Sequence, residues 1–118
     1  MATFKMTMLV SKDVARSRDF YRDVLGLKVG NDYAPHWVDF DLGSGIQLAM
    51  HPAGEGLEVH PGSMSVGFSV EDVDAFVAQL AAQNVPVLRP PQDENFGRLA
   101  LVADPDGYTV QLYTPKAT

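Results

Sequence analysis

The sequence repeats one order of secondary structure twice, and this repeat limits the possible folds more than any single motif does. The pair Asp13-Val14 returns 59 residues later as Asp72-Val73, and each pair begins an apolar pattern at helical spacing. In both halves one strand is predicted before the helix and three strands after it. Each half therefore has a sheet face that needs cover, and a second copy of the unit can provide it.

The two helices are the best defined elements of the pattern. A single amphipathic helix is predicted over residues 13–27, with Asp13 as N-cap and Gly26 in the left-handed conformation that ends a helix. Its apolar face consists of Val14, Phe20, Tyr21, Val24 and Leu25, with the small Ser17 between them. The second helix is predicted over residues 71–83, with Glu71 or Asp72 as its cap.

Alternating and turn-forming residues define the other elements. Strands are predicted over residues 4–10, 27–30, 36–42, 46–50, 63–70, 85–88, 98–103 and 108–113. A polar bend is expected at 31–35, a glycine-containing hairpin turn at 43–45, a loop at 90–95 and a tight turn at 104–107. The chain is thus expected to form one domain of two modules, about 1–51 and 63–115, joined by a linker at 52–62.

Two runs of residues carry a resemblance to a known family. The first run comprises Asp13, Phe20-Tyr21 and Leu25-Gly26-Leu27, and the second comprises Phe96-Gly97-Arg98, Asp104-Pro105-Asp106-Gly107-Tyr108 and Gln111-Leu112. In this order they resemble the two module signatures of the glyoxalase/bleomycin-resistance/dioxygenase superfamily, also called the vicinal oxygen chelate superfamily. The resemblance implies an α+β fold of two βαβββ modules, whose curved mixed sheets enclose a cup. It also implies a homodimer, with cups formed within or across subunits.

Charge and composition exclude several classes of function. The 118 residues carry a formal net charge of −6 and include no cysteine, which excludes disulfides and thiolate chemistry. An acidic chain is a poor partner for nucleic acid, while its charge suits a neutral or cationic small ligand or simply keeps the protein in solution. The sequence has no signal-peptide pattern and no apolar run near the roughly 20 residues of a membrane span. We therefore expect a cytoplasmic protein that binds neither nucleic acid nor membranes.

The resemblance also indicates where a divalent metal would be held in this chain. The four positions of the family's metal enzymes fall on Met6, Gln47, Ser65 and Gln111. A thioether is a soft ligand, a serine hydroxyl is a weak one, and neutral amides supply no charge to balance the ion. The sequence therefore predicts no metal and no other cofactor, and it argues against a metal-dependent enzyme.

The resemblance places the four metal positions in the cup, and neighbouring residues on the predicted strands complete the expected ligand surface. This surface comprises Met6, Met8, Trp37, Gln47, Ala49, His51, Ser65, Gly67, Gln111 and Tyr113. Several have an alternative structural role. The two glutamines could pair in a filled core, the methionines could fill gaps, and Trp37 could pack the hairpin rather than stack on a ligand.

No residue of this surface has a predicted catalytic role. His51 is a weak candidate for an acid or base, because the sequence shows no carboxylate partner for it. We therefore expect a protein that sequesters a small organic ligand, with a cationic, drug-like molecule as one candidate. The alternatives are a lyase, isomerase or dioxygenase of the same superfamily acting on a small metabolite, or a dimeric interaction module whose cup is filled by its own side chains.

Overall fold

The computed structural model describes residues 1–116 and divides the chain into two compact units, Met1–His60 and Pro61 onward. The first unit contains β1 (Met6–Ser11), α1 (Val14–Asp19), a π-helix (Phe20–Val24), β2 (Lys28–Tyr33), β3 (Trp37–Asp41) and β4 (Gln47–Pro52). The second contains a short 3₁₀ helix (Pro61–Ser63), β5 (Ser65–Ser69), α2 (Val73–Ala82), β6 (Val87–Glu94), β7 (Gly97–Ala103) and β8 (Thr109–Pro115). None of the described helices is long and apolar enough to cross a membrane.

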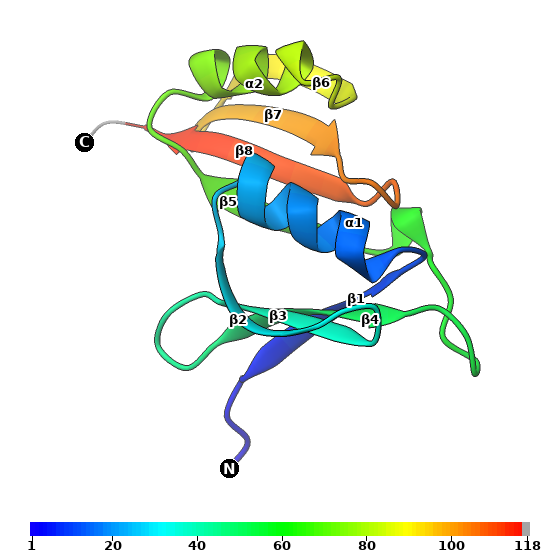
Figure 1. Ribbon diagram of the computed structural model, residues 1–118. Helices are drawn as coiled ribbons and strands as arrows, with labels where there is room; N and C mark the ends of the chain where they lie inside the picture. The colour runs from blue at the N-terminus through cyan, green and yellow to red at the C-terminus, as the bar shows by residue number, and fades with distance from the viewer. Residues whose placement is uncertain (117–118) are drawn as a thin grey trace. The chain divides into compact units, whose positions relative to one another are not determined.

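Each unit forms one four-stranded mixed sheet. The strand orders are β1-β4-β3-β2 and β5-β8-β7-β6 (Figure 1). The first strand of each sheet pairs in parallel with the last strand of the unit, and the remaining neighbours are antiparallel. The two sheets thus have the same topology, which confirms the α+β fold predicted from the repeat.

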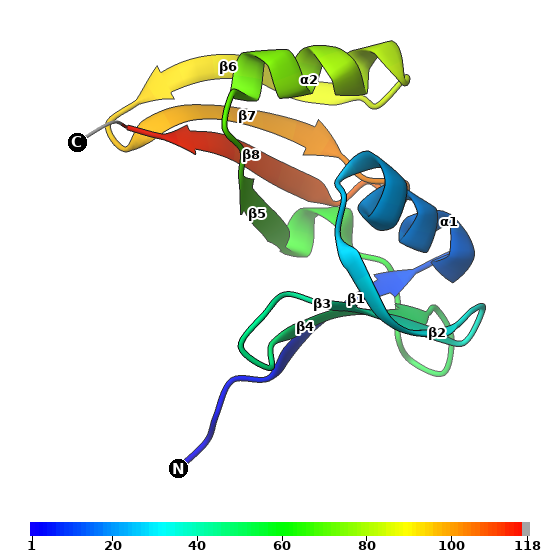
Figure 2. The same ribbon diagram turned by 60° about the vertical axis from the view of Figure 1, so that its left-hand side comes forward.

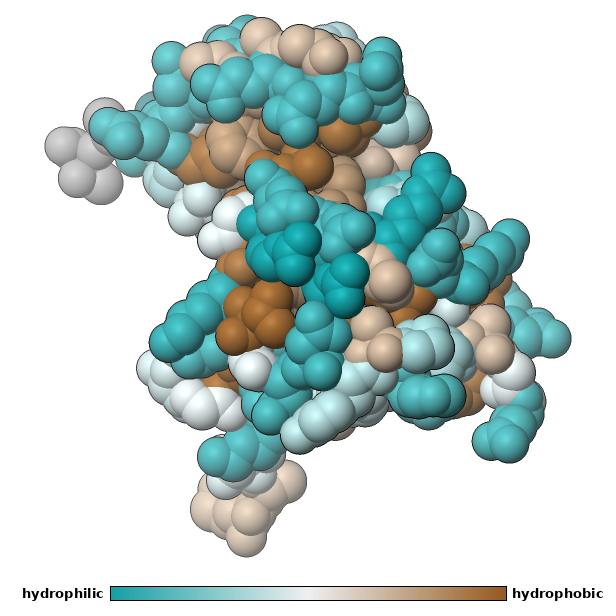
Figure 3. All heavy atoms as spheres, in the orientation of Figure 1, coloured by the Kyte–Doolittle hydropathy of each residue, from teal (hydrophilic) through white to brown (hydrophobic). Residues whose placement is uncertain are grey.

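Helix α1 and the π-helix cover one face of the first sheet (Figure 2). Alternate strand residues on this face are fully buried: Leu9, Val38, Phe40, Leu48 and Met50. The Tyr21 ring packs edge-on against Phe20, with 5.1 Å between ring centroids, and lies 6.1 Å from Phe40. Each such large side chain stabilises the unit by about 1.5–3 kcal/mol when it leaves water. The opposite side of α1 is largely hydrophilic (Figure 3).

Helix α2 covers the equivalent face of the second sheet. Its buried residues are Val73, Val77 and Leu80, and the sheet buries Ala100, Val102, Val110 and Leu112. The Asp72 side chain accepts a hydrogen bond from the Ala75 amide at 3.1 Å, so Asp72 is the cap. At the other end Asn84 has a φ of +65°, and the amides of Asn84 and Val85 donate to carbonyls of the last helical turn. These two bonds form a Schellman motif.

The first helix differs from its prediction in the second half. Asp13 caps it as expected, accepting from the Arg16 amide at 3.1 Å, and Gly26 has a φ of +79°. From Phe20 onward, however, the chain forms a π-helix in which the Leu25 amide donates to the Phe20 carbonyl. The wider turn reduces the rotation between successive residues. Two adjacent bulky rings, Phe20 and Tyr21, can therefore both be buried on the sheet.

Two edge strands extend well beyond their predicted ends, and three strands begin two residues later than predicted. Strand β2 continues through the expected polar bend to Tyr33, and β6 continues through Pro90-Pro91 to Glu94. Both are edge strands with register shifts, where polar residues and prolines are tolerated because one side needs no partner. Strands β1, β5 and β6 begin at Met6, Ser65 and Val87, rather than at the predicted residues 4, 63 and 85.

The predicted turns are present at both tight connections. Residues 43–45 all have positive φ angles, and the Leu42 amide donates to the Ile46 carbonyl at 2.9 Å. In the second unit the Asp104 carboxylate accepts from the amides of Asp106 and Tyr108, both at 2.9 Å.

Candidate functional site

Each sheet has a face opposite its helix, and these two helix-free faces carry the predicted ligand residues. In the first unit Met6 pairs with Gln47, Met8 with Ala49 and Val10 with His51. In the second unit Gly67 pairs with Gln111, and Leu99 with Tyr113. Paired residues in a sheet point to the same side, so the register assigns residues to each face. The first helix-free face contains Met6, Met8, Trp37, Asp39, Gln47, Ala49 and His51. The second contains Ser65, Gly67, Leu99, Leu101, Gln111 and Tyr113.

The four positions inferred for a metal occur as one pair in each unit. Met6 and Gln47 are direct partners in the sheet, and Met6 is 43% exposed. The Gln111 amide nitrogen donates to the Ser65 hydroxyl at 2.8 Å, two residues along from its direct partner Gly67. Gln47 and Gln111 are both half-buried. A face with this mixture can offer hydrogen bonds and an apolar wall to a bound molecule.

The chemistry of these four side chains does not fit a divalent metal ion. They supply one thioether, one hydroxyl and two amides, with neither a carboxylate nor an imidazole among them. Throughout residues 1–116, no three His, Cys, Asp or Glu side chains come together in a group that could hold a metal. We therefore derive no chemistry from a metal at these positions.

A buried carboxylate on the first helix-free face was given no role by the sequence. Asp39 is 2% exposed, and its two oxygens accept from the Asn31 amide at 2.8 Å and from the Trp37 indole N–H at 2.8 Å. The Asn31 side chain donates a further bond at 3.1 Å. Burial by itself raises the pKa of Asp39, but the hydrogen bonds from Trp37 and Asn31 outweigh it and lower the pKa. Asp39 is therefore ionised at neutral pH.

This network is built on the irregularity in β2. The register of β2 against β3 shifts between Val29 and Asp32, and Gly30 lies so close to Asp39 that a Cβ atom at that position would collide with the carboxylate. The Asp39 side chain thus accepts from a backbone amide within the bulge. The signal available in the sequence was an aspartate between apolar residues in a strand, two positions from a tryptophan.

His51 lies on the same face, and its ring is oriented by a backbone carbonyl. Its Nδ1 is 2.8 Å from the carbonyl oxygen of Pro52. A carbonyl only accepts hydrogen bonds, so in the neutral ring Nδ1 carries the hydrogen and Nε2 is the acceptor. His51 lines a hollow of about 370 Å³ together with His36, Pro52, Ala53, Gly54 and Glu55. In the described part of the chain, no carboxylate is hydrogen-bonded to its ring.

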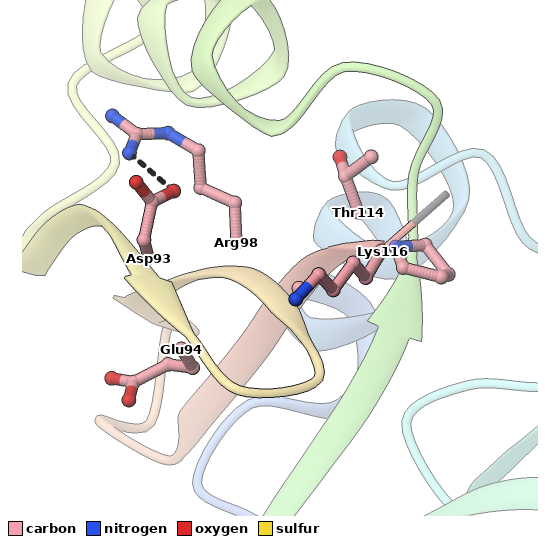
Figure 4. Close-up of a pocket in the computed structure, with 7 residues that line it drawn as sticks. Asp93, Glu94, Arg98, Thr114 and Lys116 are labelled. Atoms are coloured by element: carbon pink, nitrogen blue, oxygen red, sulfur yellow. Dashed lines mark hydrogen bonds and ion pairs between the residues drawn. The ribbon is translucent and has the colours of Figure 1, made fainter. Parts of the chain in front are cut away.

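A hollow of about 400 Å³ near the turn between β6 and β7 contains a different kind of cluster (Figure 4). Arg98 and Asp93 point toward one another there, with 3.0 Å between guanidinium and carboxylate. Arg98 also binds Asp74 of α2 at 2.7 Å. Hydrogen bonds from Arg98 lower the pKa of Asp74. Because Arg98 is held by two carboxylates at once, we interpret this cluster as a link between α2 and the hairpin.

Comparison with known proteins identifies the family. The model of the Glyoxalase/Bleomycin resistance protein/Dioxygenase superfamily matches residues 3–112. The chain belongs to this superfamily. An uncharacterized protein of Mycolicibacterium smegmatis is 28% identical over 116 residues, which cover 94% of this chain and 92% of that protein.

Two solved structures of the superfamily's fold have different described functions. TnmS3, an antibiotic binding protein from Streptomyces sp. CB03234, is 24% identical with a TM-score of 0.79, and the match covers 98% of both chains. Lactoylglutathione lyase from Agrobacterium tumefaciens is 21% identical with a TM-score of 0.74, and the match covers 97% of this chain and 94% of that one. At these identities the likeness establishes the shared fold, and function must be argued from the site.

Proposed function

We propose that this protein binds a small organic molecule without a metal and does not transform it. The proposal rests on one observation: the four side chains at the inferred metal positions are neutral and lie on the helix-free faces. They are Met6, Gln47, Ser65 and Gln111. The Gln111–Ser65 bond leaves the amide oxygen of Gln111 and the hydroxyl hydrogen of Ser65 for other partners. A ligand with a hydrogen-bond donor beside an acceptor would complement this pair.

The remaining side chains of the two faces support binding rather than catalysis. Met6 and Met8 provide adaptable apolar contacts, and Tyr113 packs edge-on against Phe96 with 6.3 Å between ring centroids. His51, the only histidine on either face, donates to a backbone carbonyl rather than to a carboxylate. TnmS3 shares the fold and binds an antibiotic, which makes drug-like molecules sensible first probes.

A screen of small organic molecules tests the proposal. Ligands should raise the melting temperature by mass action and change the fluorescence of Trp37, the only tryptophan. The double variant Gln47→Leu, Gln111→Leu replaces one amide on each face with an apolar group of similar size, so it should keep the fold and lose binding whichever face holds the ligand. Thr109→Val is a matched control, because Thr109 neighbours Gln111 on the same strand face and carries no proposed role.

Two results would contradict the proposal. One is a double variant that binds the same ligand with unchanged affinity, because the amides would then lie outside the site. The other is a small molecule that the wild-type chain converts to product while the double variant does not, because the faces would then support an enzyme.

A further inference from the structure

The charge of Asp39 has no cationic partner within residues 1–116. Its hydrogen-bond donors, Asn31 and Trp37, are both neutral. Among the described residues no lysine, arginine or histidine forms an ion pair with it. Several other aspartates do pair with an arginine: Asp19, Asp23, Asp32, Asp74 and Asp93. Buried charges in proteins are usually paired, so a full negative charge balanced only by neutral donors requires an explanation.

Aromatic side chains form a row next to this charge on the same face. Tyr33 is the direct partner of Trp37 and is 64% exposed. Trp37 precedes Val38, whose partner is Met50, and His51 follows Met50, so Trp37 and His51 lie opposite one another at that end of the strands. Tyr33, Trp37 and His51 thus occupy neighbouring register positions on β2, β3 and β4, a set that we call the aromatic row.

Asp39 acts directly on the central ring of this row. The indole N–H donates to the carboxylate at 2.8 Å, which fixes the orientation of the ring and places a negative charge at its edge. The face of an aromatic ring attracts cations through its negative quadrupole, and tryptophan does so most strongly. A nearby carboxylate reinforces this attraction, because the surroundings of Asp39 exclude water and screen the charge less than bulk solvent does.

We propose that the aromatic row, with Asp39 behind Trp37, binds an organic cation such as a quaternary or tertiary ammonium group. The proposal rests on the proposed function, since it names the ligand class for the first helix-free face. A strongly hydrated metal cation does not suit the row, because aromatic faces cannot replace its water ligands. An alkylammonium group spreads its positive charge over its methyl groups, which can contact the rings while they stay near the Asp39 charge.

A pair of isosteric probes tests the inference. Choline and its neutral analogue, in which a carbon atom replaces the nitrogen, are titrated into the intact chain by calorimetry. We expect saturable binding of choline and at least about tenfold weaker binding of the neutral analogue. Asp39→Asn should weaken choline binding by about tenfold, and Trp37→Leu should abolish it. Asp41→Asn removes a charge of the same sign from the same strand, where the side chain is 49% exposed, and should change affinity less than twofold because solvent screens that charge.

The outcomes separate this inference from the proposed function. Three results would each overturn the cation site: equal binding of both probes, unchanged choline affinity in Asp39→Asn, or no binding of choline. In each case the glutamine double variant would still test the proposed function with a neutral ligand. If Asp39→Asn fails to fold, Tyr33→Leu replaces it. Tyr33 is exposed, so this variant should fold. A full loss of its preference for choline over the neutral analogue would support binding of the cation by the aromatic row. Unchanged choline affinity in Tyr33→Leu would also overturn the proposal.

Discussion

Replacing Asp39 with asparagine should destabilise the first unit out of proportion to the small chemical change. The carboxylate has two acceptor oxygens, one for the Asn31 amide and one for the Trp37 indole. Asparagine has a single oxygen, so its NH₂ group must face one of these donors. A hydrogen bond to a charged group contributes about 1.5–3 kcal/mol, and a buried donor left without a partner costs about 1–3 kcal/mol. The two terms overlap, so we expect the free energy of unfolding to fall by about 2–4 kcal/mol.

The pH dependence provides an independent measure of the same effect. Because the pKa of Asp39 is lowered in the folded state, its ionisation stabilises the fold above the unfolded pKa of about 3.9. That contribution is lost as the pH falls through the lower, folded pKa. The difference between wild type and Asp39→Asn should therefore be largest near pH 7 and should narrow below about pH 4. The other carboxylates are the same in both proteins and cancel in the difference.

Urea unfolding between about pH 3 and 7 measures both quantities, with Trp37 fluorescence reporting on the first unit and circular dichroism on the whole chain. Asp41→Asn is the control, since Asp41 lies on the same strand and keeps an oxygen for the Gly43 amide. We expect the unfolding free energy of this control to fall by no more than about 0.5–1 kcal/mol. The reasoning is refuted if Asp39→Asn is as stable as the control, or if its difference from wild type does not change with pH.

Three further predictions follow from other parts of the chain. Protein purified without a chelating tag should contain no stoichiometric nickel, zinc, iron or manganese by elemental analysis; about one ion per chain that EDTA removes would instead favour a metal enzyme of the superfamily. Sedimentation at micromolar concentration should show a homodimer with an interface of at least about 1,200 Å², because each sheet ends in edge strands without an outer partner; a monomer alone would contradict this. Asp72→Ala should lower the unfolding free energy by about 1 kcal/mol through loss of the α2 cap, whereas Asp72→Ser should retain most of it; equal losses in chemical denaturation would argue against the cap.

The sequence predicted the features that depend on neighbours along the chain. The Asp13 cap, the choice of Glu71 or Asp72 as the second cap, and the glycine turn at 43–45 follow from local hydrogen bonding and backbone conformation, which a few adjacent residues determine. The internal repeat then predicted two sheets of equal topology, because the same local pattern occurs twice. Met6, Gln47, Ser65 and Gln111 were placed in one ligand surface by the resemblance to the superfamily, which the positions of the two module signatures carry.

Tertiary structure decided the features that depend on residues far apart in sequence or on packing. The π-helix at Phe20 follows from burying two adjacent rings on the sheet, and β6 passes through two prolines only because it lies at an edge. Asp39 is the clearest case. Its sequence neighbours resemble those of the exposed Asp41, and what distinguishes it is the bulge in β2 that brings Gly30 and Asn31 against it. A bulge is a property of two paired strands, so the burial and ionisation of Asp39 are set by that pairing rather than by its own segment.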